Sequence, residues 1–144
     1  MYTYNYPRAA LTVDAIVFVK EEDKILVLLI ERGREPFKNK WALPGGFIEM
    51  DETLETACKR ELLEETGLLV DKMLQFKTYD AINRDPRHRT ISVIYYAELD
   101  KKQYVKGGDD AARADWFPIS ELPELAFDHK QIIEEFFDYL RKEH

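Results

Sequence analysis

The sequence contains a single cysteine, Cys58, which excludes an internal disulfide and is typical of a reducing compartment. No apolar run approaches the ~18–20 residues that a membrane-spanning helix needs. The first residues, MYTYNYPR, lack the basic and then apolar segments of a secretory signal. We therefore expect a cytoplasmic protein with no membrane partner.

Basic residues are also in the minority. The chain has 21 Lys and Arg against 28 Asp and Glu, a net charge of −7. Non-specific binding to nucleic acid depends on clusters of Lys and Arg, so no nucleic-acid partner is expected. The negative charge is concentrated locally, because residues 49–65 hold seven acidic side chains and only two basic ones, Lys59 and Arg60.

Repeats, low-complexity tracts and linkers are absent as well, and 144 residues suit one domain, which we expect over residues 1–144. Hydrophobic patterning predicts strands at Ala10–Lys20, Ile25–Ile30, Leu74–Asp80, Thr90–Glu98 and Ala114–Ile119. It predicts helices at Leu54–Thr66 and Phe127–Lys142, and a short apolar stretch at 41–43 that Pro44-Gly45-Gly46 stops. Together these elements predict an α/β protein with a mixed sheet packed between helices.

Three glutamates, Glu61, Glu64 and Glu65, lie within about one turn near the end of the first predicted helix. On a helical wheel Glu61 and Glu65 fall with the apolar residues, toward the body of the protein. A solvated acidic face, which is the alternative interpretation, would point the other way. Either Asp51 or Thr53 can cap the start of this helix, and a left-handed glycine can follow its end.

Carboxylates this close repel one another, and partial burial increases the cost. A hard divalent cation removes that penalty, because such ions prefer oxygen ligands. Mg²⁺ is commonly held by few carboxylates together with waters and substrate phosphates. The cluster therefore predicts a phosphate-bearing substrate, and it explains how an acidic protein can bind a polyanion.

The residues of this segment resemble the Nudix box, G-x5-E-x7-R-E-U-x-E-E-x-G-U, at every position: Gly46, Glu52, Arg60-Glu61-Leu62, Glu64-Glu65 and Gly67-Leu68. The resemblance implies the Nudix fold, an α/β/α sandwich with a mixed β-sheet and a loop–helix–loop catalytic motif. It also implies Mg²⁺- or Mn²⁺-dependent hydrolysis of a nucleoside diphosphate that is linked to another group.

The same resemblance implies roles for individual residues. It assigns the metal to the three glutamates and to one backbone carbonyl: Gly45, Glu61, Glu64 and Glu65. It further implies that Arg60 orients the glutamates and pairs with Glu52.

Candidate substrate-binding residues lie outside the box. The loop NRDPRHR contains Arg84, Arg87 and Arg89, and arginine forks match phosphate oxygens. A solvated turn stiffened by proline explains this loop equally well. Arg32 and Arg34, in the loop that precedes the box, are further candidates of the same kind.

The segment Gly107-Gly108-Asp109-Asp110 offers two more acids. The glycines allow a close backbone approach, and Asp109 or Asp110 could be a metal ligand or the base for the attacking water. An ordinary turn is the competing interpretation. Asp128 is interpreted as an N-cap and His129 as a residue that starts the last helix.

Three longer segments resemble one branch of the family: EPFKNKWALPGGFIE, NRDPRHRTISVIYYAEL and GGDDAARADWFPISELPELAFDH. That branch contains ADP-ribose pyrophosphatases and the nucleotide-sugar-binding domains of regulators. The regulators add a winged-helix DNA-binding domain, for which this chain leaves no room, and they often lose box glutamates. The resemblance therefore favours an enzyme that converts ADP-ribose to AMP and ribose 5-phosphate.

Two alternatives remain open. The first is a hydrolase of nucleoside triphosphates or dinucleoside polyphosphates. The second is a non-catalytic module that senses a nucleotide sugar. Oligomeric state is open too, because the alternating Tyr2, Tyr4 and Tyr6 fit an edge strand, a stacking surface in a homodimer or a disordered end.

Overall fold

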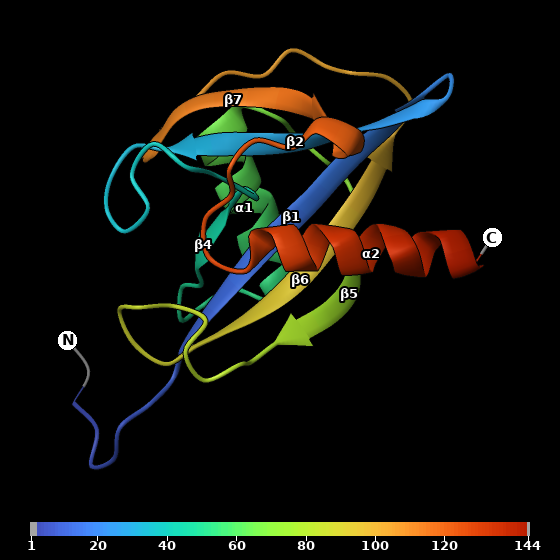
Figure 1. The fold of residues 1–144 in the computed structure, drawn as a ribbon. Helices are drawn as coiled ribbons and strands as arrows, with labels where there is room; N and C mark the ends of the chain where they lie inside the picture. Colours follow the sequence, from blue (N-terminus) through green and yellow to red (C-terminus); the bar gives the residue numbers. More distant parts are fainter. Residues whose placement is uncertain (1–2, 144) are drawn as a thin grey trace.

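The computed structural model describes residues 3–143 (Figure 1). Its strands are β1 Ala10–Glu21, β2 Lys24–Arg32, β3 Trp41–Ala42, β4 Gly45–Phe47, β5 Leu74–Tyr79, β6 Thr90–Leu99 and β7 Ala111–Pro118. Its helices are α1 Leu54–Thr66, α2 His129–Glu143 and the short 3-10 helix η1 Ile119–Glu121. Within residues 3–143, no helix has the length and apolar character required to span a membrane.

Strand β1 is the centre of a mixed sheet with the order β3-β2-β1-β6-β5. It runs parallel to β6 from Ala10 to Val19 and antiparallel to β2. Along its other edge β1 changes partner: β4 pairs with Thr12–Asp14, whereas β2 pairs with Phe18–Glu21. This change of partner separates the ends of β2 and β4 beside Asp14.

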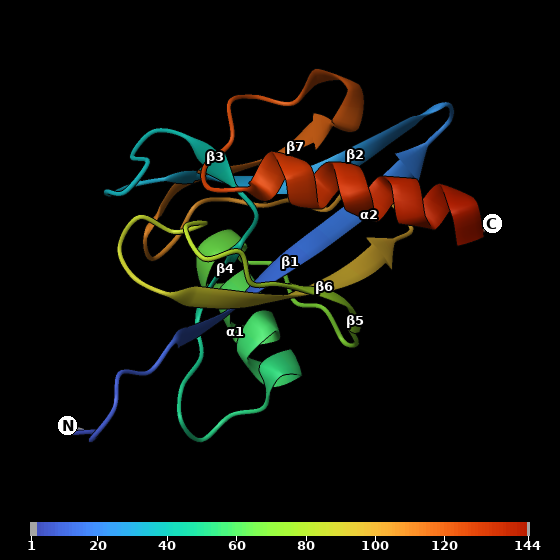
Figure 2. The same cartoon turned by 60° about the horizontal axis from the view of Figure 1, so that its bottom comes forward.

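Helices α1 and α2 cover opposite faces of the sheet, as Figures 1 and 2 show from two directions. Successive side chains of a strand point to opposite faces, so β1 contributes to two cores. Val13, Ala15 and Val17 pack with α1, whereas Ile16 and Phe18 pack with α2. The predicted α/β/α sandwich with a mixed sheet is confirmed.

Helix α1 has the predicted bounds, and its ends have clear local causes. The Thr53 hydroxyl accepts a hydrogen bond from the Thr56 N–H at 3.3 Å, so Thr53 rather than Asp51 caps the helix. Gly67 adopts φ 76° and donates its N–H to the Leu63 carbonyl at 2.9 Å. A left-handed residue at this place ends the helix at little steric cost only when it is glycine.

Other boundaries differ from the prediction. The apolar stretch does stop before Pro44, but Gly45 and Gly46 begin another strand, β4, because pairing with β1 outweighs the weak strand preference of glycine. Strand β7 begins at Ala111 rather than Ala114, through pairing with the end of β2. Helix α2 begins at His129 rather than Phe127, whose φ of 52° is incompatible with a right-handed helix.

The tyrosine-rich N-terminus forms no strand over residues 3–9, so of the three interpretations left open the edge strand is not found there. Tyr4 and Tyr6 are exposed, and this segment extends away from the sheet (Figure 1). Tyr2 lies outside the described residues.

Candidate active site

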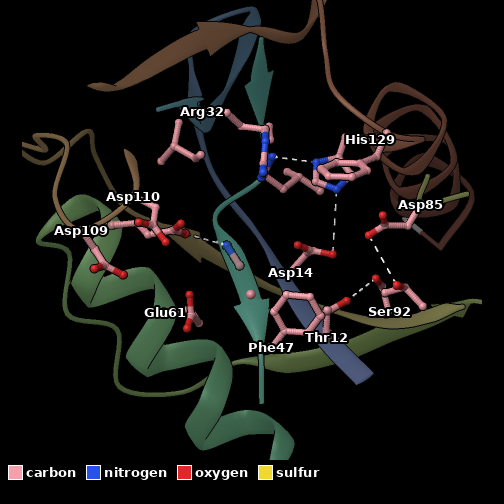
Figure 3. A pocket seen from close by; sticks show the side chains of 18 of the residues that line it. Thr12, Asp14, Arg32, Phe47, Glu61, Asp85, Ser92, Asp109, Asp110 and His129 are labelled. Atoms are coloured by element: carbon pink, nitrogen blue, oxygen red, sulfur yellow. Dashed lines mark hydrogen bonds and ion pairs between the residues drawn. The ribbon is translucent and has the colours of Figure 1, made fainter. Parts of the chain in front are cut away.

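A cavity of about 610 Å³ opens where β1 changes partner. It is lined by the ends of β1 and β2, by β4, by α1, by the loop around residues 84–90 and by the start of α2. Figure 3 shows Glu61, Asp109 and Asp110 on one side of the cavity and Asp85, Ser92 and His129 on the other. Of the predicted site residues, the structure brings most to this cavity: Arg32, Gly45, Arg60, Glu61, Glu65, Arg84, Arg87, Asp109 and Asp110.

The acidic side of the cavity is built from α1 and β4. Glu65 is 6% exposed and accepts a hydrogen bond from the Gly45 N–H at 2.8 Å. Glu61 faces Gly46 so closely that a Cβ there would lie 2.5 Å from its Oε2. Glu64 does not line the cavity, and its side chain is 43% exposed. The expected orientation of Glu61 and Glu65 toward the protein body is confirmed.

Arg60 holds this acidic cluster together. Its Nε and Nη2 donate to the two oxygens of Glu52 at 3.0 and 2.7 Å, which is the pairing the resemblance implies. Its Nη1 donates to Glu61 at 2.8 Å and to Glu64 at 3.1 Å. One planar guanidinium therefore fixes the positions of three carboxylates.

Burial makes the remaining negative charge costly. It raises the pKa of Glu65 to about 9, against a lowering by the Gly45 hydrogen bond, and it raises the pKa of Glu61 despite Arg60. The charge of Asp109 adds to both shifts. A cation bound on the acidic side of the cavity would therefore offset the cost of charging these carboxylates.

These residues fit a divalent ion by chemistry, because they offer several carboxylate oxygens at one side of the cavity, and a cation favours the deprotonated form of Glu65. Within residues 3–143, no three His, Cys, Asp or Glu side chains converge closely enough to hold a metal ion as they stand. The reason is visible in the contacts of Arg60, which engages both Glu61 and Glu64. A metal ion bound by Glu61 and Glu64 would compete with Arg60 for their oxygens.

Asp109 and Asp110 reach the cavity from the loop before β7. The Gly108 N–H donates to the Glu65 carbonyl at 3.2 Å, which fixes this loop against the end of α1. A Cβ at position 108 would lie 2.6 Å from the Glu64 carbonyl, so glycine permits this approach. Asp110 is ion-paired with Arg34, whereas the Asp109 carboxylate has no hydrogen bond or ion pair within residues 3–143.

Arg84 lines the cavity but forms an internal ion pair. Its Nε and Nη2 donate to the Asp128 carboxylate at 2.8 and 2.7 Å, and its Nη1 donates to Ser92 at 2.7 Å. Its side chain is only 5% exposed, and that of Asp128 is 17% exposed. The Asp128 carboxylate, which the sequence analysis interprets as an N-cap, accepts both of these hydrogen bonds from Arg84.

We expect the ion pair between Arg84 and Asp128 to stabilise the fold. Arg84→Met should lower the free energy of unfolding by about 3 kcal/mol, because it leaves the Asp128 carboxylate, which is largely shielded from solvent, without its partner. Urea unfolding measures this loss. Arg141→Met is the matched control, since its ion pair with Asp138 is exposed and should contribute less than about 1 kcal/mol. Equal effects of the two substitutions would contradict this assignment.

The other predicted arginines differ in their surroundings. Arg87 is bound to Asp85, and Arg89 lies outside the cavity lining, where it donates to the carbonyls of Asp80 and Ala81. Arg32 donates its Nε to the Pro36 carbonyl at 2.6 Å. Burial, followed by the nearby charge of Arg87, lowers the pKa of Arg32.

Two further residues line the cavity: Asp14, which the sequence analysis does not name, and His129, which it interprets only as the start of the last helix. Asp14 is 7% exposed, and burial raises its pKa to about 7, against a lowering by Arg84. His129 accepts the Leu43 N–H on Nδ1 at 3.0 Å, so its proton lies on Nε2, which is 4.0 Å from Asp14. Burial lowers the pKa of His129 to about 4 and keeps it neutral. The sequence signal that could have identified Asp14 is an acidic residue inside the otherwise apolar run of β1.

Comparison with known proteins places this geometry in a family. The model of the NUDIX domain matches residues 9–138. An ADP-ribose pyrophosphatase from Methanocaldococcus jannaschii is 43% identical over 136 residues, which are 94% of this chain and 76% of that relative.

Similar solved structures belong to the same family. The NUDIX domain of Shewanella oneidensis NrtR, complexed with ADP-ribose, matches with a TM-score of 0.87 and 34% identity over 94% of this chain and 90% of that one. A bifunctional NMN adenylyltransferase/ADP-ribose pyrophosphatase from Francisella tularensis, complexed with AMP and an Mn ion, gives a TM-score of 0.82 and 30% identity. The match covers 94% of this chain but 43% of that protein. The chain therefore belongs to the NUDIX domain family and is a Nudix hydrolase that resembles ADP-ribose pyrophosphatases.

Proposed function

We propose that this protein hydrolyses the pyrophosphate bond of ADP-ribose, with Mg²⁺ or Mn²⁺, to give AMP and ribose 5-phosphate. The observation that carries the proposal is a cavity with a buried acidic side and arginines among its other lining residues. The similarity to an ADP-ribose pyrophosphatase and to an ADP-ribose complex supports the choice of substrate.

The acidic side would hold the ion through Glu61, Glu64 and Glu65, together with the Gly45 carbonyl. A divalent ion bound there supplies Lewis-acid chemistry, since it neutralises phosphate charge and lowers the pKa of water. Arg60 orients the glutamates through the contacts described above. Asp109 is the candidate to accept the proton of the attacking water, because its carboxylate is not engaged by Arg34 as that of Asp110 is.

Arg32 is the proposed anchor for the phosphates. Within residues 3–143, four other arginines line the cavity, and each is ion-paired with a carboxylate: Arg34, Arg60, Arg84 and Arg87. Arg32 has only a carbonyl partner for its Nε and stands half-buried beside Arg87. A desolvated guanidinium of this kind favours a bound anion.

A substrate panel tests the proposal. With millimolar Mg²⁺ we expect ADP-ribose to yield AMP without inorganic phosphate or pyrophosphate, and chelation by EDTA to abolish turnover. Product analysis by chromatography should show slower cleavage of nucleoside triphosphates and dinucleoside polyphosphates. Preferred release of pyrophosphate from a triphosphate would instead support the alternative hydrolase and reject ADP-ribose as the substrate.

A second candidate is a module that binds a nucleotide sugar without cleaving it. Two observations favour it: no three acidic side chains of residues 3–143 converge as they stand, and Arg60 engages Glu61 and Glu64. Micromolar binding of ADP-ribose in calorimetry, with no turnover in either Mg²⁺ or Mn²⁺, would support the module and reject the hydrolase.

A further inference from the structure

Arg87 differs from a free phosphate anchor because its charge is already compensated. Its Nε and Nη2 donate to the two Asp85 oxygens at 3.1 and 2.8 Å, and its backbone N–H donates to the same carboxylate at 2.9 Å. The Asp85 side chain is only 4% exposed. The guanidinium of Arg87, whose side chain is 35% exposed, is therefore oriented and paired by a buried carboxylate.

The guanidinium of Arg87 lies close to two aromatic rings. Its central carbon is 5.2 Å from the centroid of Phe47 and 5.7 Å from that of Phe127. Both rings line the cavity, and Phe47 is 42% exposed. Phe127 adopts φ 52°, a conformation that a bulky side chain keeps only when its surroundings impose it.

These groups share one property, which is a planar surface. A guanidinium plane and a phenyl ring both stack on heterocyclic bases. Ribose and phosphate have no flat face to use such a surface. A compensated charge also suits an uncharged base better than a phosphate, which would meet the Asp85 carboxylate as well.

The position of this surface suits one end of a nucleotide. Figure 3 shows Asp85, the partner of Arg87, on the side of the cavity opposite Glu61 and Asp109. Arg32 lies beside this surface, because its guanidinium carbon is 5.1 Å from the Phe127 centroid, and it lines the same cavity as Glu65. A cavity of about 610 Å³ has room for a ligand that extends from one side to the other.

We propose that Arg87, Phe47 and Phe127 form the subsite for the nucleobase, in which Arg87 is a stacking surface and not a phosphate anchor. The inference rests on the proposed function only in taking the substrate to be a nucleotide. It fixes the orientation of that nucleotide, with the base beside Arg87 and the pyrophosphate between Arg32 and the glutamates.

Binding of AMP and of adenosine, measured by calorimetry with EDTA present, tests the proposal. Arg87→Lys keeps a positive charge beside Asp85 but removes the planar group. We expect the Kd of AMP and the Kd of adenosine to rise by the same factor of about ten, the change that follows from loss of one stacking contact. Phe47→Leu, at a half-exposed position, should affect both ligands in the same way.

Arg113→Lys is the matched control. Arg113 forms the same kind of fork, to Glu31 at 3.0 and 3.1 Å, and lies 5.2 Å from the Trp41 ring, but it is outside the cavity lining. It should change neither Kd, and thermal unfolding should show that every variant is folded.

Three results would overturn the subsite. Weaker binding of AMP with unchanged binding of adenosine would make Arg87 a phosphate anchor. Unchanged binding of both ligands in both cavity variants, or binding of neither ligand to the wild type, would remove the subsite altogether. Since no turnover is measured, a chain that bound both ligands as expected but failed to hydrolyse ADP-ribose would contradict the proposed function alone.

Discussion

Glu61→Gln is expected to leave the fold intact and to lower kcat/KM for ADP-ribose by at least about a thousandfold, equivalent to about 4 kcal/mol of transition-state stabilisation. The substitution keeps the size of the side chain and its contact with Arg60 but removes a charge that the proposed cation needs. Steady-state kinetics at saturating Mg²⁺ measures the loss.

Glu134→Gln is the matched control for Glu61→Gln, because Glu134 is an exposed glutamate on α2 outside the cavity. It should retain wild-type kinetics. Glu61→Gln with a kcat/KM within about threefold of wild type would remove Glu61 from the catalytic site, since losing a metal ligand costs several kcal/mol.

Stability should depend on pH and on metal through Glu65. Its pKa is about 9 in the folded chain against an ordinary value of 4.5, so between these values the folded state holds a proton that the unfolded state releases. The free energy of unfolding therefore falls as pH rises from about 5 to about 9 without divalent ions. Asp14, with its pKa raised to about 7, adds a loss of the same sign.

Differential scanning fluorimetry with EDTA checks this sign. We expect the Tm of the wild type to drop by about 6 °C between about pH 6 and pH 8.5, the shift for losing about 2 kcal/mol in a chain of this size. Glu65→Gln should reduce that drop, because it removes the buried acid. Millimolar Mg²⁺ should restore the Tm of the wild type most strongly at the higher pH, where protons compete least.

A matched comparison separates Glu65 from general charge effects. Glu134→Gln removes one acid of the same type from the solvent-exposed side of α2 and should leave the pH dependence unchanged. A wild-type Tm that increases from about pH 6 to pH 8.5 in EDTA would contradict the assigned burial of Glu65, because the sign of the dependence follows from its raised pKa.

The sequence was most informative where local signals decide structure. The bounds of α1 follow from Thr53, from Gly67 and from the spacing between them, which are all local. The orientation of Glu61 and Glu65 follows from the helical period alone. The box pattern adds the family, and the structure has the pairing of Arg60 with Glu52 that this pattern implies.

What could not be read from the sequence depends on distant partners. Strand β4 exists because β1 pairs with it, although its glycines locally favour a turn. Arg84 and Arg87 are equivalent in the sequence, yet Arg84 pairs with Asp128, 44 residues away, whereas Arg87 pairs with Asp85 in its own loop. Such pairings are set by tertiary contacts, and they decide which arginine keeps a charge available for a ligand.

Asp14 is a second case in which contacts with distant residues could not be predicted from the sequence. Its sequence neighbours are apolar and predict only a buried strand, and its surroundings come from Ser92, Arg84 and His129 on other elements. A buried acid in a strand is unusual enough to mark a site. It gives no indication of which groups surround the acid until the fold brings them together.

Direct binding of Mn²⁺, followed by the electron paramagnetic resonance of the free ion, tests the central claim without reference to turnover. Wild-type protein should remove Mn²⁺ from solution with a Kd at or below the millimolar range, and Glu61→Gln/Glu65→Gln should bind it at least about tenfold more weakly, since two carboxylate ligands are lost. Equal binding by the wild type and the double variant would show that these glutamates do not form a metal site, and the proposed hydrolysis would have to be abandoned.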